Sequence, residues 1–310
     1  MGKKTVVEGI LLVNKPAGLT SHDVVKRLRQ ASGWKKIGHF GTLDPLATGL
    51  LLLGIGRATR LFPVLSKLPK TYQATVRLGM ATDTYDAEGR ALSPPSHAFP
   101  SKGELFRLVK EFEGEKEQLP PPFSAKKYRG RPLYRLARRG QPVPLKPVKV
   151  TIYHLELLDY NPPDLTLELV CSSGTYVRSL AHELGQKAGC GAYLFRLSRL
   201  SIGPFSLKKA FSLEEVETRF REKQPEKVLV PLEKVFEESP KAVLKTKVSL
   251  PLRKGRPLPA AALQSVIFSG TAMPPPKEEN IIRLFSQKGN FLGLARPGEG
   301  PGTLIPFLLL

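Results

Sequence analysis

The sequence contains few cysteines and is short of acidic residues. Only two of its 310 residues are cysteine, Cys171 and Cys190, and neither lies in a C-x-x-C or His-paired spacing. Because two cysteines are too few for a disulfide framework, we expect a reducing cytoplasm. Lys and Arg number 48 against 27 Asp and Glu, which gives a formal charge of +21. Such a basic excess indicates a polyanionic partner, with nucleic acid the leading candidate.

Long apolar runs and several cofactor motifs are also absent. No apolar stretch reaches membrane-spanning length, and the first one ends at Asn14-Lys15-Pro16, so we expect neither a membrane span nor a signal peptide. Gly54-Ile-Gly56 lacks the third glycine of a dinucleotide fingerprint. In His182-Glu183-Leu-Gly-Gln186, glutamine stands where a zinc-protease helix needs its second histidine. These failures argue against a dinucleotide-binding fold and against a zinc-protease site.

Strand-like and helix-like patterns are both present, which favours an α+β fold. Branched or alternating apolar residues predict strands over residues 9–13, 50–55, 72–78, 148–158 and 165–171. Apolar residues at helical spacing predict helices over 22–32, capped by Thr20 or Ser21 and ended by Gly33, and over 176–187. A further helix is expected over 58–66, and Ser-x-x-Glu capping boxes predict two more after Ser101 and Ser212. Residues 38–49 are expected to form an irregular, glycine-rich segment.

The stretch from about 222 to 248 is charged and interrupted by proline, which indicates a domain boundary. Beyond it, short apolar segments alternate with Gly and Pro turns, as in a small barrel or sandwich. We therefore expect a large domain over residues 1–240 and a small β-rich domain over residues 245–310.

Asp44 is the candidate for chemistry, because it lies in a loop bracketed by glycines and is followed by Pro45. Glycine allows a close backbone approach to a ligand, and proline restricts the preceding residue to extended conformations, which suits a carboxylate that must be aimed. The alternative is an ordinary Asx turn at an Asp-Pro dipeptide.

An insert at about residues 119–147 contains the densest basic stretch. Lys126 to Arg139 holds seven Lys or Arg and no acid, with Tyr128 and Tyr134 interleaved. Basic groups contact phosphates and aromatic rings stack on unpaired bases, so the composition predicts an RNA-binding segment, although a solvated helix face is the alternative. The predicted RNA-binding residues here are Lys126, Lys127, Arg129, Arg131, Arg135, Arg138 and Arg139.

Two segments together, Val13-Asn-Lys-Pro-Ala-Gly-Leu-Thr-Ser21 and Gly38-His-Phe-Gly-Thr-Leu-Asp-Pro-Leu-Ala-Thr-Gly49, resemble the bacterial TruB family of tRNA pseudouridine-55 synthases. Further matching segments follow in order: Lys70-Thr-Tyr72, Leu78 to Gly89, Gln118 to Ala125, Gly130 to Tyr134 and Cys171 to Arg178. The resemblance covers roughly residues 9–205. It implies an isomerase that flips a uridine out of the T-arm loop of tRNA, cuts its N-glycosidic bond, turns the base and makes a carbon-carbon bond, without metal or cofactor.

The resemblance also implies roles for six residues. Asp44 would be the essential nucleophile or base, and it must be ionised. Arg178 would orient Asp44 through charge-assisted hydrogen bonds. Tyr72 would pack on the target base and transfer a proton. His39 would support the flipped-out nucleotide. Lys15 would hold the catalytic loop, and Leu197 would line the uracil pocket.

Without the family match, each of the five supporting residues has an ordinary interpretation. Arg178 would be a surface arginine near a helix start, and Lys15 a solvated loop lysine. Tyr72 and Leu197 would be core residues, and His39 a structural histidine.

The last sixty or so residues resemble a PUA domain, through Gly255-Arg-Pro, Gly289 to Ala295 and the closing apolar strand. This likeness implies contact with the acceptor stem of tRNA. We also expect a monomer that needs no obligatory protein partner. Three alternatives stay open: a non-catalytic RNA-binding or RNA-folding protein, a guide-RNA-dependent relative with protein partners, and a carboxylate hydrolase with Asp83 or Asp86 as its second acid.

Overall fold

The computed structural model describes residues 7–92, 94–123, 146–245, 256–267 and 281–310, together with the backbone of 127–128 and 131–132. Its helices are α1 (Ser21–Ser32), α2 (Phe62–Leu65), α3 (Lys102–Lys110), α5 (Val177–Lys187) and α6 (Leu213–Arg221), with 3-10 turns η1 (Gly56–Leu61), η2 (Leu207–Lys209), η3 (Pro225–Lys227), η4 (Leu232–Lys234) and η6 (Ala260–Ala262). None of the helices in these ranges is long and apolar enough to span a membrane.

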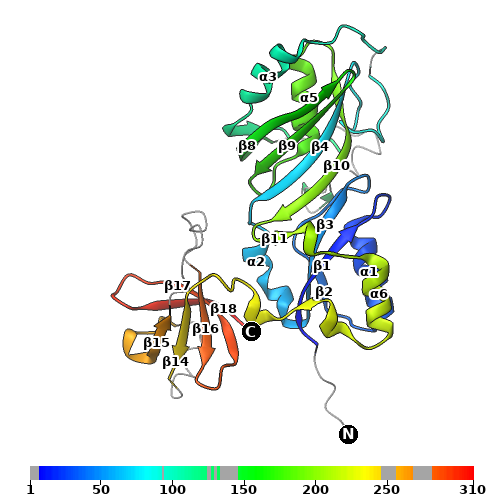
Figure 1. Cartoon of the computed structure of the whole chain (residues 1–310). Helices are drawn as coiled ribbons and strands as arrows, with labels where there is room; N and C mark the ends of the chain where they lie inside the picture. Colours follow the sequence, from blue (N-terminus) through cyan, green and yellow to red (C-terminus); the bar gives the residue numbers. More distant parts are fainter. Residues whose placement is uncertain are drawn as a thin grey trace.

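The large sheet is mixed and runs in the order β12-β1-β3-β10-β4-β9-β8-β5, with β2 beside β3, β11 beside β10 and β13 beside β1 (Figure 1). Its strands are β1 (Gly9–Lys15), β2 (Ile37–His39), β3 (Thr48–Ile55), β4 (Lys70–Leu78), β5 (Gly114–Gln118), β8 (Val148–Asn161), β9 (Asp164–Cys171), β10 (Ala192–Ile202), β11 (Phe205–Ser206), β12 (Phe211–Ser212) and β13 (Leu229–Val230). Helices α3 and α5 accompany the β8-β9-β4-β10 half, and α1 and α6 accompany the β1-β3 half. The predicted α+β fold is therefore confirmed.

The two halves of this sheet meet through a short parallel contact between β3 and β10. Only Thr48 and Gly49 pair there, with Ser198 and Arg199. Gly49 has φ +97°, and a Cβ atom built on it would lie 2.4 Å from the carbonyl oxygen of Arg199. Only glycine tolerates both the positive φ and the lack of space for a Cβ atom. With glycine at position 49, the chain that follows the loop can lie directly against the backbone of Arg199.

The continuous apolar run of β3 is explained by burial on both faces. Leu51 and Leu53 belong to the core that includes α1 and α5, whereas Leu50 and Leu52 belong to a second core that includes α2. Successive side chains of a strand point to opposite faces, so a strand covered on both sides needs apolar residues at every position.

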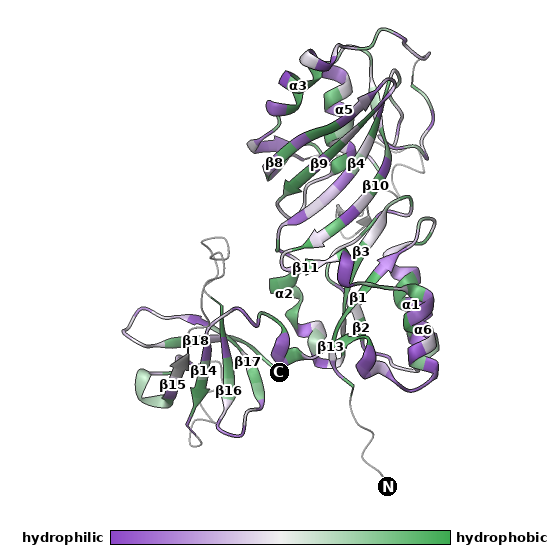
Figure 2. Ribbon diagram, viewed as in Figure 1, coloured by the Kyte–Doolittle hydropathy of each residue, from purple (hydrophilic) through white to green (hydrophobic). Residues whose placement is uncertain are grey.

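The small sheet runs in the order β15-β14-β16-β17-β18, and its strands are β14 (Lys241–Leu244), β15 (Leu263–Ile267), β16 (Ile282–Ser286), β17 (Phe291–Pro297) and β18 (Leu304–Leu309). These strands are largely hydrophobic (Figure 2). Leu294 and Leu308 pack in the same apolar cluster as Val64 and Leu65 of α2, so the two sheets share a core. The β-rich end of the chain is as expected.

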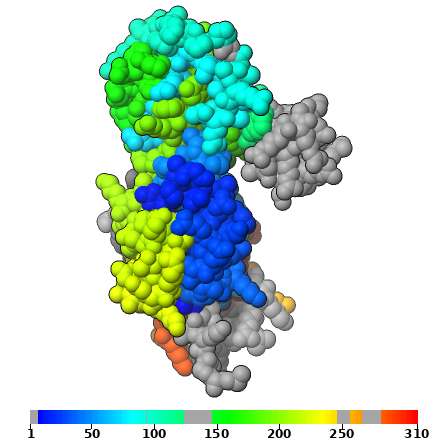
Figure 3. Space-filling model, turned by 90° about the vertical axis from the view of Figure 1, so that its right-hand side faces the viewer, coloured from blue at the N-terminus to red at the C-terminus, as the bar shows by residue number. Residues whose placement is uncertain are grey.

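The helix ends follow the predicted signals. Thr20, Ser101 and Ser212 each accept a hydrogen bond from the third residue of the helix that follows, and the side chain of that residue accepts one from the cap backbone. Helices α1 and α6 lie side by side (Figure 3), where Arg27 donates to both carboxylate oxygens of Glu217 at 2.7 and 2.8 Å.

Two local expectations were wrong. Residues 58–66 form not one helix but the 3-10 turn η1 followed by the single turn α2. Pro63 has no amide hydrogen to donate to the preceding turn, so it fits the first turn of α2 but not the interior of a longer helix. Residues 38–49 are irregular only at 40–47, because β2 and β3 extend into the segment from both ends.

Candidate active site

The loop over residues 40–47 is held on both sides of Asp44. The buried Ser21 hydroxyl accepts a hydrogen bond from the Leu43 amide at 2.8 Å and donates to the Leu43 carbonyl at 3.2 Å. On the other side, the Gly18 amide donates to the Pro45 carbonyl at 2.8 Å. The peptides that flank Asp44 are therefore fixed by the segment that leads into α1.

Lys15 strengthens the same attachment. Its side chain has no exposed surface, and Nζ donates to the carbonyl oxygens of Pro16, Leu19 and Pro45 at 2.9, 2.7 and 3.3 Å. Burial lowers the pKa of Lys15 to about 8, while the negative charge of Asp44 opposes this shift. These contacts contradict the solvated-lysine interpretation.

Arg199 holds the beginning of the loop. It is 1% exposed, and its guanidinium donates to the carbonyl oxygens of Leu50, Thr42 and Gly41 at 2.8, 3.3 and 3.1 Å. The fork of an arginine suits three acceptors in different directions, which a lysine ammonium on one atom cannot match.

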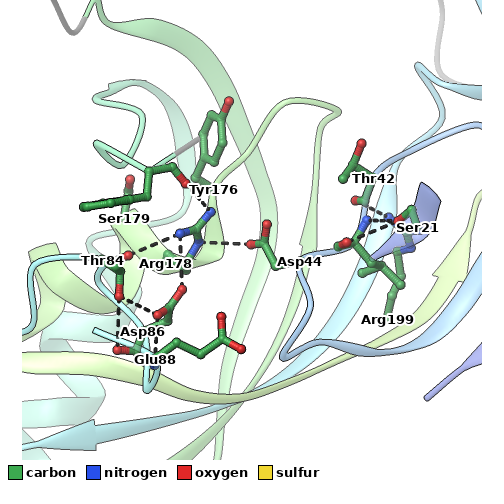
Figure 4. Close-up of polar contacts among 12 residues, drawn as sticks. Ser21, Thr42, Asp44, Thr84, Asp86, Glu88, Tyr176, Arg178, Ser179 and Arg199 are labelled. Atoms are coloured by element: carbon green, nitrogen blue, oxygen red, sulfur yellow. Dashed lines mark hydrogen bonds and ion pairs between the residues drawn. The ribbon is translucent and has the colours of Figure 1, made fainter. Parts of the chain in front are cut away.

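Asp44 itself contacts Arg178. Its Oδ2 lies 3.0 Å from Nε of Arg178, and the side chains of the two residues are 35% and 7% exposed. Figure 4 shows Asp44 between Arg178 on one side and the group of Ser21, Thr42 and Arg199 on the other. The Asp44 carboxylate is thus held by Arg178 on one side and is partly open to solvent. Because Arg178 is buried, the interpretation of it as an ordinary surface arginine is contradicted.

Arg178 is fixed in turn by a buried acid. Its Nη1 lies 3.2 Å from Oδ2 of Asp86, whose side chain is 4% exposed, and its other partners are the carbonyl oxygens of Thr84 and Phe123 at 3.3 and 3.1 Å. The second oxygen of Asp86 accepts from the Thr84 hydroxyl at 2.5 Å. The helix dipole disfavours a cation such as Arg178 in the first turn of α5, and the negative charge of Asp86 offsets this unfavourable placement.

The chain matches proteins of known family over most of its length. Residues 29–177 match the TruB family pseudouridylate synthase N-terminal domain, and residues 178–237 match the tRNA pseudouridylate synthase B C-terminal domain. It is 45% identical to tRNA pseudouridine synthase B of Aquifex aeolicus over 77% of this chain and 83% of that protein, and 46% identical to that of Syntrophotalea carbinolica over 72% and 73%. The chain belongs to the TruB family of pseudouridine synthases.

Solved structures show the same fold. Cbf5 in a Cbf5-Nop10-Gar1 complex superposes with a TM-score of 0.70 at 24% identity, covering 97% of this chain and 85% of that chain. A chain of an H/ACA RNP bound to a substrate RNA gives 0.69 at 23% identity, again over 97% and 85%. At this identity the likeness extends to the fold alone.

The other TruB-family positions lie around Arg199. Tyr72 is 9% exposed, and burial raises the pKa of its phenol, whereas the charge of Arg199 and a side-chain hydrogen bond to it lower the pKa. Burial also lowers the pKa of His39, and Arg199 adds to that shift. Leu197 is 8% exposed in the core, two residues before Arg199 on β10. Arg199 thus links positions that are distant in the sequence.

The predicted RNA-binding insert lies largely outside the described residues. Of its basic residues, only the backbones of Lys127 and Arg131 are described, in the antiparallel strands β6 (Lys127–Tyr128) and β7 (Arg131–Pro132). The other basic residues lie outside the described residues: Lys126, Arg129, Arg135, Arg138 and Arg139. The RNA-binding role of all seven stays a prediction.

Three residues of this arrangement were missed as site residues. Ser21 was predicted only as a cap, Asp86 only as the second acid of a hydrolase, and Arg199 not at all. An available signal for Arg199 was its spacing of two from Leu197, which places both on one face of a strand. In the described ranges, no group of three or more His, Cys, Asp or Glu side chains is placed to hold a metal ion. His182, of the zinc-like motif, stacks on Tyr85 with ring centroids 3.8 Å apart.

Proposed function

We propose that this chain converts a uridine of tRNA to pseudouridine, that the target is uridine-55 in the T-arm loop, and that Asp44 carries the reaction. The observation that supports this most directly is the 3.0 Å contact between the partly exposed Asp44 carboxylate and the buried Arg178. A group that must be aimed at an incoming substrate needs one free side and a rigid support, and Asp44 has both.

In the proposed reaction the N1–C1′ bond of uridine breaks and a C5–C1′ bond forms. The hydrogen on C5 leaves as a proton, and N1 gains one. Asp44 starts the reaction by attack on the sugar or the base, or by removing a proton on the way to a glycal, and each route needs the carboxylate ionised. Tyr72, beside Arg199, takes part in the proton transfer and packs on the base.

The remaining residues have supporting roles in this proposal. Arg178 orients Asp44, Lys15 holds the loop, Leu197 lines the uracil pocket and His39 supports the flipped nucleotide, whose extrusion costs a few kcal/mol. The basic insert binds the T-arm. The domain over residues 245–310 binds the acceptor stem, and the catalytic domain covers residues 1–240. We also propose a monomer without an obligatory protein partner.

The test is incubation of the purified chain with unmodified tRNA and no added cofactor, followed by nucleoside mapping. We expect pseudouridine at position 55 in whole tRNA and in an isolated T-arm stem-loop. Asp44→Asn should bind tRNA like the wild type but form no pseudouridine. Modification by Asp44→Asn would refute the role of Asp44.

The same experiment separates the alternatives. An RNA-binding or RNA-folding protein would leave the nucleosides unchanged with the wild-type chain. A guide-dependent enzyme would be inactive on bare tRNA and would gain activity only with added RNA and proteins.

A further inference from the structure

Arg199 is a buried cation whose guanidinium donates to three backbone carbonyl oxygens, besides its side-chain hydrogen bond with Tyr72. Two of these carbonyls belong to Gly41 and Thr42, in the loop that carries Asp44, and the third belongs to Leu50 on β3. The guanidinium therefore joins the beginning of the loop to the strand that follows it. The loop is closed by a side chain from β10, about 150 residues away in the sequence.

The main chain of β10 acts together with this side chain. Gly49 lies so close to the backbone of Arg199 that a Cβ atom would lie 2.7 Å from the Arg199 nitrogen and 2.4 Å from its oxygen. The backbone of Arg199 thus contacts Gly49 on β3, just after the loop, and its side chain binds Gly41 and Thr42 at the beginning of the loop. Ser21, from α1, independently clamps Leu43 in the middle.

We infer that Arg199 is a positioning residue for the catalytic aspartate, and that it works with Ser21 to immobilise residues 41–44 before substrate binds. This inference rests on the proposed function of Asp44. Arg199 touches neither oxygen of Asp44 among the contacts of the structure; it acts on the backbone to which the carboxylate is attached. Displacing a catalytic group by about 1 Å can cost roughly a hundredfold in rate, so the two hydrogen bonds that tie Gly41 and Thr42 to Arg199 have a direct effect on turnover.

The first test variant is Arg199→Lys, which keeps the positive charge but replaces the fork with one nitrogen. We expect its single-turnover rate on tRNA to fall about a hundredfold, while its Kd for tRNA stays within about threefold of the wild type. The matched control is Arg77→Lys. Arg77 also binds with its fork, to Asp164 at 2.6 and 2.7 Å, but it lies five residues from Tyr72 on β4 and therefore points to the opposite face of the sheet.

The second measurement is amide hydrogen exchange of residues 40–47 in the free protein, which needs no substrate. Arg199→Lys should accelerate exchange in this segment and not in α6. Ser21→Ala should do the same, with a rate loss of about tenfold, and it carries the test if Arg199→Lys does not fold. If wild-type protein fails to modify tRNA, the proposed function falls, whereas the exchange experiment still decides whether Arg199 holds the loop.

Three results would overturn the inference. The first is unchanged exchange in residues 40–47 of the folded variants. The second is a rate for Arg199→Lys that equals the wild-type rate. The third is a Kd for tRNA that rises as much as the rate of Arg199→Lys falls, because a positioning residue acts on turnover and not on binding.

Discussion

Replacing Asp86 by Asn tests whether the buried acid controls Asp44 through Arg178. The substitution keeps the size of the side chain and one oxygen acceptor for the Thr84 hydroxyl. It puts an NH2 group where Oδ2 now lies, 3.2 Å from Nη1 of Arg178. Two donors would then face each other between side chains that are 4% and 7% exposed, so the guanidinium must turn or shift.

The size of the effect follows from these contacts. A hydrogen bond to a charged group contributes about 1.5–3 kcal/mol, and a tenfold change in rate corresponds to about 1.4 kcal/mol. If the loss is transmitted to Asp44 through Nε of Arg178, the rate of the chemical step should fall roughly 10- to 100-fold. Binding of tRNA should change little, because the Asp86 carboxylate and the Arg178 guanidinium are both buried.

The assay is tritium release from tRNA that carries [5-³H]uridine, under single-turnover conditions, since forming the C5–C1′ bond expels the C5 hydrogen. Filter binding gives the Kd in parallel. Asp164→Asn is the control, because it also loses an arginine partner, Arg77, at a position a third exposed. An Asp86→Asn rate within about threefold of the wild type, or a Kd that rises as much as the rate falls, would refute the reasoning.

Three further predictions concern stability. Burial lowers the pKa of Lys70 to about 8, so between pH 8 and 10.5 the unfolded chain holds a proton that the folded chain has lost. As the pH rises through this range, the free energy of unfolding of the wild type should therefore increase by up to about 3 kcal/mol relative to that of Lys70→Met. Urea unfolding at pH 7.5 and 10 checks this, and a difference between the two proteins that does not depend on pH contradicts it. Glu217→Gln weakens the pair with Arg27 and should cost about 1–2 kcal/mol in thermal unfolding while activity at low temperature is retained. Gly49→Ala forces a Cβ against Arg199 at a positive φ and should lower the free energy of unfolding by at least about 2 kcal/mol, so normal stability of this variant would show that the strand contact is loose.

The sequence predicted the fold where local signals and burial agree. The Thr20 cap and Gly33, which adopts the left-handed conformation at φ 71°, set the ends of α1 as expected. The uninterrupted apolar run of β3 was readable as a buried strand. Pro63 is the signal in the sequence against one long helix over 58–66.

The support of the site could be predicted only in part. Arg178 and Lys15 were predicted as site residues only through the family resemblance, because their own surroundings in the sequence allow ordinary interpretations, whereas Asp44 was also indicated by its glycine-bracketed loop. The contacts of Arg199 with Gly41 and Thr42 depend on the pairing of β10 with β3, a tertiary feature that no local pattern encodes. Asp86 was visible as an acid, but its attachment to Arg178 depends on how its loop packs against α5.

The positive charge of the chain thus serves two separate purposes. Lys15, Arg178 and Arg199 are each at most 6% exposed and point at carbonyl or carboxylate oxygens inside the protein. Buried cations of this kind cannot release counterions from a phosphate backbone, so they add nothing to the salt-dependent part of RNA affinity. That part must come from exposed residues such as Lys35 and Lys36, just before β2. A net charge of +21 therefore overstates the charge available for RNA, and the cations that matter most for positioning Asp44 are those that RNA phosphates cannot reach.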